Sequence, residues 1–89
     1  MVIRVAEFDE APAFHDDPAL LVAFRDWIRS QPGFRQGWHA TEPATGKLAS
    51  ISVWDDMPSV LAVKERPFPG GPLGAKPDRV TLYDHVEPI

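Results

Sequence analysis

The sequence predicts an α+β fold in which two helices cover one face of a four-stranded antiparallel sheet. Four segments alternate apolar with polar residues, as half-buried strands do. Two further segments carry apolar residues at helical spacing, and each begins with an aspartate and a proline. The resulting order is strand, helix, strand, strand, helix, strand.

The first part of the chain holds one strand and the longer helix. Val2 to Phe8 is rich in β-branched and aromatic residues and predicts a strand. After a loop from Asp9 to His15, the run Asp16-Asp17-Pro18 predicts a helix start, because aspartate caps free N–H groups and proline fits the first turn. Pro32-Gly33 ends this helix. Its mainly apolar stripe consists of Leu20, Phe24, Trp27, Ile28 and Gln31.

The rest of the chain predicts a hairpin, a short helix and a closing strand. Phe34 to Thr41 and Lys47 to Asp55 are the hairpin strands, joined by a loop whose glycine can take a positive φ. An aspartate pair caps a helix from Met57 to about Glu65. Arg66 to Asp78, rich in proline and glycine, predicts a stiff and ordered surface loop. Arg79 to Glu87 alternates again and predicts the last strand.

This order is the split βαβ arrangement of ferredoxin-like domains, and 89 residues suffice for one domain, 1–89. Apolar residues make up 44% and charged residues 25% of the chain, as in ordinary globular proteins. The chain has no cysteine, which excludes a disulfide framework and a thiolate metal site. No apolar run approaches the ~20 residues that span a bilayer, and the charged opening does not fit a signal peptide. We therefore expect a cytoplasmic protein.

The distribution of charge argues against two kinds of partner. The net charge is −4, and the nine lysines and arginines are scattered along the sequence. Binding to nucleic acid or to an anionic membrane surface relies on clustered cations. We therefore expect neither nucleic acid nor a membrane as a partner.

Alternation sorts the strand residues into two sets. The apolar set is Ile3, Val5, Phe34, Trp38, Ala40, Ala49, Ile51, Val53, Val80 and Leu82. The mixed set is Arg4, Ala6, Phe8, His39, Ser50, Ser52, Trp54, Thr81, Tyr83 and His85. The helices cover one face only, and neither set suits a large face in water. We therefore predict a homodimer whose sheets pack face to face.

Several short motifs carry a family resemblance. They are Pro32-Gly33-Phe34, Ser50-Ile51-Ser52-Val53-Trp54, Asp55-Asp56-Met57 before the helix with Ala62, and the closing strand with Tyr83. In these motifs the chain resembles, over nearly its whole length, the antibiotic-biosynthesis-monooxygenase-like group of the dimeric α/β-barrel superfamily. The resemblance implies a dimeric α/β barrel with a pocket between sheet and helices, lined by Trp54. Members of this group include cofactor-independent oxygenases of electron-rich phenols, haem-degrading enzymes and proteins without known activity.

The chain departs from the group's pattern at positions that bear on activity. The oxygenases carry asparagine where Ser50 stands, and the haem-degrading enzymes need a first-strand asparagine and a histidine where Lys64 stands. This chain contains no asparagine, so haem degradation is not expected. On the second helix, Val60, Leu61 and Val63 occupy positions where these enzymes often carry aromatic and polar residues.

The mixed set supplies the candidate site. The catalytic candidates are His39, Trp54 and Tyr83, and the substrate-binding candidates are Arg4, Ser50 and Ser52. Imidazole titrates in the range that a general base needs, while indole N–H and phenol O–H groups can donate to a phenolate-type anion. A phenolate that itself gives an electron to oxygen requires no cofactor, so none is expected.

Each candidate also has an ordinary structural explanation. A tryptophan at a strand end, like Trp54, often packs in the core with its N–H on a carbonyl. His39 fits a partly exposed strand position, and Tyr83 fits an interface. Arg4 has thirteen carboxylates with which to pair. Trp27 and Trp38 are assigned to packing, and the three histidines share no metal-ligand spacing, so no metal site is expected.

Three functions remain open at this point. The first is a cofactor-independent monooxygenase acting on an aromatic or polyketide-like small molecule. The second is a non-catalytic small-molecule-binding or accessory homodimer, and the third is an isomerase or cyclase on the same scaffold. The sequence does not choose among them, because function depends on the site rather than on the fold.

Overall fold

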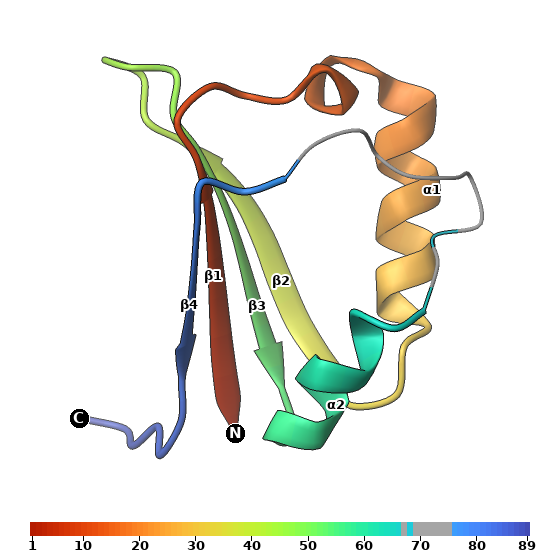
Figure 1. Cartoon of the computed structure of the whole chain (residues 1–89), viewed down its shortest axis with the longest axis vertical. Helices are drawn as coiled ribbons and strands as arrows, with labels where there is room; N and C mark the ends of the chain where they lie inside the picture. Colours follow the sequence, from red (N-terminus) through yellow and green to blue (C-terminus); the bar gives the residue numbers. More distant parts are fainter. Residues whose placement is uncertain (67, 69–75) are drawn as a thin grey trace.

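A computed structural model describes residues 1–66, 68 and 76–89 (Figure 1). Its elements are β1 (Val2–Phe8), a turn of 3₁₀ helix η1 (Ala13–Asp16), α1 (Pro18–Arg29), β2 (Phe34–Thr41), β3 (Leu48–Trp54), α2 (Met57–Val63) and β4 (Arg79–Tyr83). The strands form one antiparallel sheet in the order β2-β3-β1-β4. The predicted α+β fold is confirmed, and it is compatible with the ferredoxin-like arrangement. No helix within the described residues is long and apolar enough to cross a membrane.

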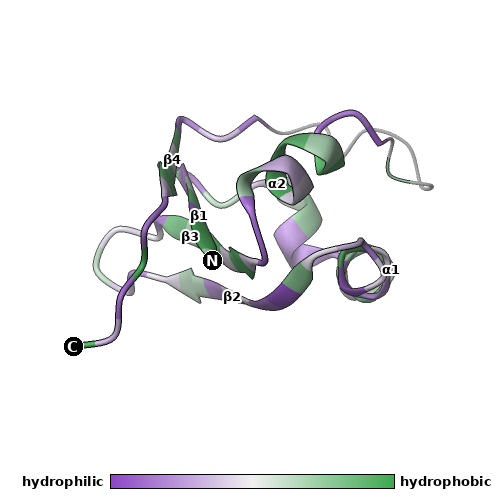
Figure 2. Ribbon diagram, turned by 90° about the horizontal axis from the view of Figure 1, so that it is seen from below, coloured by the Kyte–Doolittle hydropathy of each residue, from purple (hydrophilic) through white to green (hydrophobic). Residues whose placement is uncertain are grey.

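Both helices begin as the sequence predicts and lie on the same side of the sheet (Figures 1 and 2). The N–H of Leu20 donates to Asp17 Oδ1 at 3.1 Å, and the N–H of Ser59 donates to Asp56 Oδ1 at 2.9 Å. An aspartate therefore caps each helix, and a proline occupies each first turn, where its missing N–H leaves no hydrogen bond unmade.

The last predicted strand and the second helix are shorter than expected. β4 ends at Tyr83 rather than Glu87 because the chain turns at Asp84, whose Oδ1 accepts the N–H of His85 at 2.8 Å. His85 takes a φ of 53°, which ends the extended backbone. α2 ends at Val63, two residues before the predicted end. Most of the loop predicted from Arg66 to Asp78 lies outside the described residues.

The core consists of two separate apolar clusters on the helix-facing side of the sheet. The first is Val2, Trp54 and Val60, and the second is Ala6, Phe8 and Leu48. The first cluster joins the sheet to α2. Phe14 of η1 meets Phe8 edge-on at 6.5 Å between ring centroids, which closes the second cluster. α1 contributes no fully buried side chain, so this helix is held off the sheet.

The predicted assignment of residues to the two faces is right for β1 and β3 and wrong for β4. In the register, Val80 pairs with Ala6 and Leu82 pairs with Arg4, so both lie on the helix-facing side. Thr81 and Tyr83 therefore belong to the open face, away from the helices. Alternation within a strand separates two sets of residues, but only the register shows which set joins which face of the neighbouring strand.

A β-bulge in β2 places Phe34 on the helix-facing side of the sheet, which is not the face that alternation predicted. The register shifts between Phe34 and Gln36, so that Phe34 pairs with Trp54 on the helix-facing side while Trp38 pairs with Ile51 on the open face. The predicted apolar set wrongly placed Phe34 and Trp38 together. Phe34 instead packs edge-on against Trp54, with ring centroids 5.3 Å apart.

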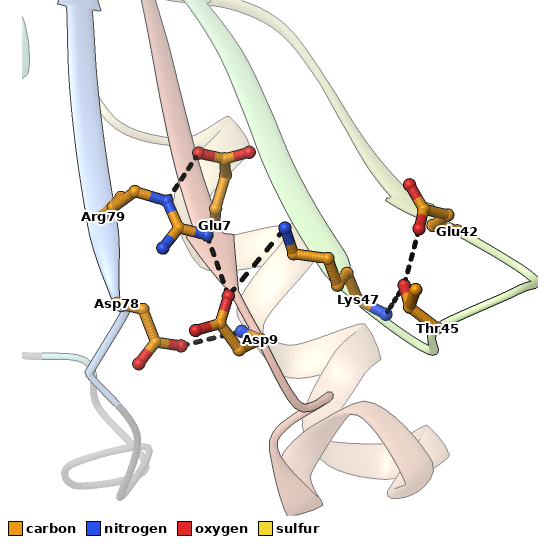
Figure 3. A network of polar contacts seen from close by, with 7 residues as sticks. All are labelled: Glu7, Asp9, Glu42, Thr45, Lys47, Asp78 and Arg79. Atoms are coloured by element: carbon orange, nitrogen blue, oxygen red, sulfur yellow. Dashed lines mark hydrogen bonds and ion pairs between the residues drawn. The ribbon is translucent and has the colours of Figure 1, made fainter.

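A network of charged side chains fastens β4 to the end of β1 (Figure 3). Arg79 donates to Glu7 Oε2 at 3.2 Å and to Asp9 Oδ1 at 2.8 Å, and Lys47 Nζ lies 4.0 Å from the same Asp9 oxygen. The N–H of Asp9 donates to Asp78 Oδ2 at 2.7 Å. The hydrogen bond from Arg79 lowers the pKa of Asp9, and the two carboxylates raise the pKa of Arg79. These contacts hold the edge strand in register where the chain enters it.

The turn before β2 requires glycine for two reasons. Gly33 has a φ of +85°, and a Cβ at this position would lie 2.3 Å from Ser59 Oγ. We expect Gly33→Ala to lower the free energy of unfolding by more than the ~1 kcal/mol that left-handed backbone costs a side chain, because Ser59 must also shift. The matched control is Gly46→Ala, where φ is +75° and no atom lies within 4 Å. Urea denaturation measures both losses, and equal losses would contradict the predicted clash.

Candidate functional site

An open cleft of about 660 Å³ lies between the sheet and α1. Its floor is the middle of the helix-facing side of the sheet, and Phe24 and Trp27 of α1 form the opposite wall. Phe34 of β2 lines one end beside Trp54. The lining also takes in atoms of Trp38 and Ile51, although by register these two residues belong to the open face.

The cleft exists because the middle of the floor holds small and polar residues. Across the sheet, Arg4, Ser52 and Gly37 form one row, and Ser50 and His39 belong to the next. These rows lie between the two apolar clusters. Since short side chains do not reach α1, the space above them stays open. The cleft thus lies where the apolar pattern on the helix-facing side of the sheet is interrupted.

The structure brings together five of the six predicted site residues. The residues that line the cleft are Arg4, His39, Ser50, Ser52 and Trp54. Tyr83 does not line it: it pairs with Ile3 on the open face and is 54% exposed. The prediction of Tyr83 as a neighbour of the others was wrong because β4 was assigned to the wrong face.

Trp54 takes part in the cleft through its neighbour Ser52. The residue is 1% exposed, and its Nε1–H donates to Ser52 Oγ at 2.9 Å. The predicted donor to a substrate anion is therefore already occupied. A serine hydroxyl that accepts one hydrogen bond still has its own O–H to donate. The O–H of Ser52, on the floor of the cleft, can therefore donate the hydrogen bond that the indole was expected to provide.

His39 is a half-buried histidine at the α1 side of the cleft. Its ring lies nearly parallel to that of Phe24, with an interplanar angle of 18° and centroids 6.0 Å apart. Burial lowers the pKa of His39, and electrostatic repulsion of its charged form by Arg25 and His15 lowers it further. His39 is therefore neutral at neutral pH and able to accept a proton. His15 meets it edge-on at 6.4 Å between ring centroids, and its buried Nδ1 has no hydrogen-bond partner among the described residues.

Arg4 lies half-buried on the floor, beside Ser52. None of the ion pairs in the described part of the chain involves Arg4, so the expected pairing with one of the thirteen carboxylates is not found there. Burial lowers its pKa, because a guanidinium ion loses hydration inside the cleft. Among the described residues, this cation has no counter-ion on the floor of the cleft.

Five lining residues on α1 were not predicted as part of the site. Phe24, Trp27 and Ile28 were assigned to the apolar stripe that packs on the sheet, and all three also line the cleft. Arg25 and Arg29 line it as well. Their spacing of four residues, directly beside the apolar stripe, was the available signal, because positions i and i+4 share a helix face.

The described residues contain no group of three or more His, Asp or Glu side chains that would hold a metal ion. No protein-family model matches the chain, and no curated protein matches it significantly. The chemistry of the cleft therefore has to be judged from its own side chains.

The lowered pKa of His39 makes stability depend on pH in a defined direction. An unfolded histidine titrates near its ordinary pKa of 6.5, while the pKa of His39 is lower in the folded state. The contribution of His39 is thus complete above pH about 6.5 and is lost as the pH falls from there through the lower folded-state pKa. We expect the melting temperature to fall between pH about 7.5 and 5.5, and to fall less in His39→Gln. Circular dichroism melts measure this, and identical pH profiles would contradict it.

Proposed function

We propose that the protein binds an aromatic small molecule in the cleft and oxygenates it without a cofactor. The observation that carries the proposal is a cleft of about 660 Å³ that combines aromatic walls with a neutral histidine. Small-molecule sites typically have volumes of roughly 300–1,000 Å³, apolar walls and a few placed polar groups. Phe24, Trp27 and Phe34 supply the apolar walls, and His39, Ser50 and Ser52 supply the polar groups.

The proposed reaction converts a ring CH₂ group next to a phenolic system into a carbonyl. His39 takes a proton from the substrate, and the resulting anion gives one electron to O₂. The substrate radical and superoxide combine to a peroxide anion, which takes the proton back from His39 and becomes a hydroperoxide. His39 then removes the remaining C–H proton as the O–O bond breaks, which leaves the C=O group, and gives this proton to the departing hydroxide to form water. One oxygen atom enters the product and the other leaves as water, so O₂ is the oxidant and no external reductant is consumed.

Ser52 stabilises the anion in this scheme. Its hydroxyl oxygen already accepts the hydrogen bond of Trp54 Nε1, and this polarises the O–H bond toward a second acceptor. An oxyanion near Ser52 would therefore meet a donor held in position by a buried side chain. Preorganised donors of this kind stabilise charge that develops in the transition state.

A second candidate is a non-catalytic homodimer that binds the same kind of ligand. It is favoured by Trp54, whose N–H is used inside the protein rather than directed at a substrate. An isomerase or cyclase would use the same proton transfer at His39 without consuming oxygen. The three functions therefore differ in oxygen uptake and in product formation.

Oxygen uptake with anthrone tests the proposal. We expect uptake above the rate in buffer, and a loss of about 10²-fold or more in His39→Ala, the usual range for removing a general base. Trp54→Phe should also be slower, because Ser52 loses its polarising partner. Tyr83→Phe is the matched control on the open face and should retain the parent rate. If the parent protein consumes oxygen only at the buffer rate, the oxygenase proposal fails. Binding without turnover then supports the second candidate, and a product formed without oxygen supports an isomerase or cyclase.

We also propose that the chain belongs to the group it resembles and forms its dimeric α/β barrel through the open face. Trp38 and Tyr83 are 48% and 54% exposed on this face, beside the half-buried Ile51 and Val53. An exposed apolar surface of this kind is typical of an interface. A second copy is the proposed partner, because two small clusters make a thin core for 89 residues, and pairing of sheets would bury more apolar surface.

Sedimentation tests the dimer. The parent protein should show about twice the 9.9 kDa mass of the chain at micromolar concentration. Tyr83→Lys should release monomers, since a lysine ammonium on the paired face would lose its hydration. Val22→Lys is the control, because Val22 is a valine of α1 that is 56% exposed. A parent protein that sediments as a monomer would exclude the dimer.

A further inference from the structure

The cleft has a charge opposite to that of the whole chain. The chain carries a net charge of −4, with nine cationic and thirteen acidic residues. In the part of the chain that the structure describes, five of the nine cations line the cleft, whereas none of the acidic residues does. The five cations are Arg4, Arg25, Arg29, Arg35 and Lys64. They come from β1, α1, the start of β2 and the end of α2, so distant parts of the sequence converge on one positive site.

Only one of these five cations is neutralised within the described residues. Arg35 forms an ion pair with Asp55 outside the cleft floor. Arg25, Arg29 and Lys64 are exposed at the rim, where water hydrates them. Arg4 is the exception, because it is half-buried on the floor and has no ionic partner there. A buried charge without a partner is costly, and a bound anion would offset that cost.

The floor also presents a second donor beside Arg4. Arg4 and Ser52 are direct cross-strand partners on the same side of the sheet, and such pairs have Cβ atoms roughly 4.5–5.5 Å apart. Ser52 Oγ accepts from Trp54, so its O–H remains to donate. A planar guanidinium fork with an adjacent hydroxyl fits the two oxygens of a carboxylate.

We propose that the natural ligand of the cleft is an aromatic carboxylate, whose acid group Arg4 and Ser52 bind. Its rings lie against Phe24 and Trp27, and the rim cations Arg25, Arg29 and Lys64 draw the anion toward the opening. This inference rests on the proposed function in taking the cleft as the binding site. It adds the substrate class, an acid with a permanent negative charge apart from any phenolic group.

Two probes of the same shape test this inference by calorimetry. Naphthalene-2-carboxylate carries the charge, and naphthalene-2-carboxamide is its neutral counterpart; neither has a phenolic group, so binding is measured apart from oxygenation. We expect the parent protein to bind the carboxylate about tenfold or more tightly than the carboxamide, because only the carboxylate accepts charge-assisted hydrogen bonds as an anion. This comparison needs no variant.

Variants of Arg4 then test whether this residue binds the carboxylate group. Arg4→Gln should remove the preference for the carboxylate and leave affinity for the carboxamide unchanged. Arg4→Lys keeps the charge without the fork and should lose part of the preference. The matched control is Arg66→Gln, which removes an exposed arginine that donates to Gln31 and does not line the cleft. It should bind both probes as the parent does.

The outcomes separate this inference from the proposed function. Equal affinity for both probes in the parent protein would overturn the carboxylate site and leave the aromatic cleft in place. Binding of neither probe at millimolar concentration would overturn both the carboxylate site and the cleft as a binding site. A clear preference for the carboxylate, in a protein that consumes no oxygen with anthrone, would support this inference and contradict the oxygenase.

Discussion

The register between β1 and β3 is the constraint on which the rest of the structure depends. Seven consecutive pairs run without a break from Val2 opposite Trp54 to Phe8 opposite Leu48. This register places apolar pairs at both ends of the helix-facing side and polar or small pairs in the middle. Because side chains alternate with a period of two, a slip of one residue would carry all of them to the other face. The same pairing thus determines the core, the cleft and the composition of the open face.

Much of the fold could be predicted from the sequence, because local signals are strong in this chain. β1 and β2 have the predicted bounds, and both helices start at the predicted aspartate and proline. Alternation alone could not predict which face of the sheet the β4 side chains and Phe34 occupy. β4 reaches the sheet after a long connection, so its register depends on tertiary pairing with β1. The bulge adds one residue to β2, and alternation does not reveal where such an insertion falls.

The candidate site could be predicted in part for a related reason. Polar residues in strands are visible in the sequence, and four predicted ones do share the cleft with Trp54. The aromatic wall that α1 contributes was not visible, because an apolar stripe that packs on a sheet and one that lines a cleft have the same spacing. Phe24 and Trp27 pack against Phe68 and also line a cleft whose floor holds small and polar side chains, which their spacing alone does not reveal.

The three tryptophans lie in three different environments. Trp54 is buried in the first core cluster, Trp27 walls the cleft, and Trp38 is 48% exposed on the open face. Indole emission depends on its surroundings, so each ring should carry its own optical signature. Unfolding, occupancy of the cleft and association of chains would then be distinguishable in solution from intrinsic fluorescence alone, by comparing variants that retain one tryptophan at a time.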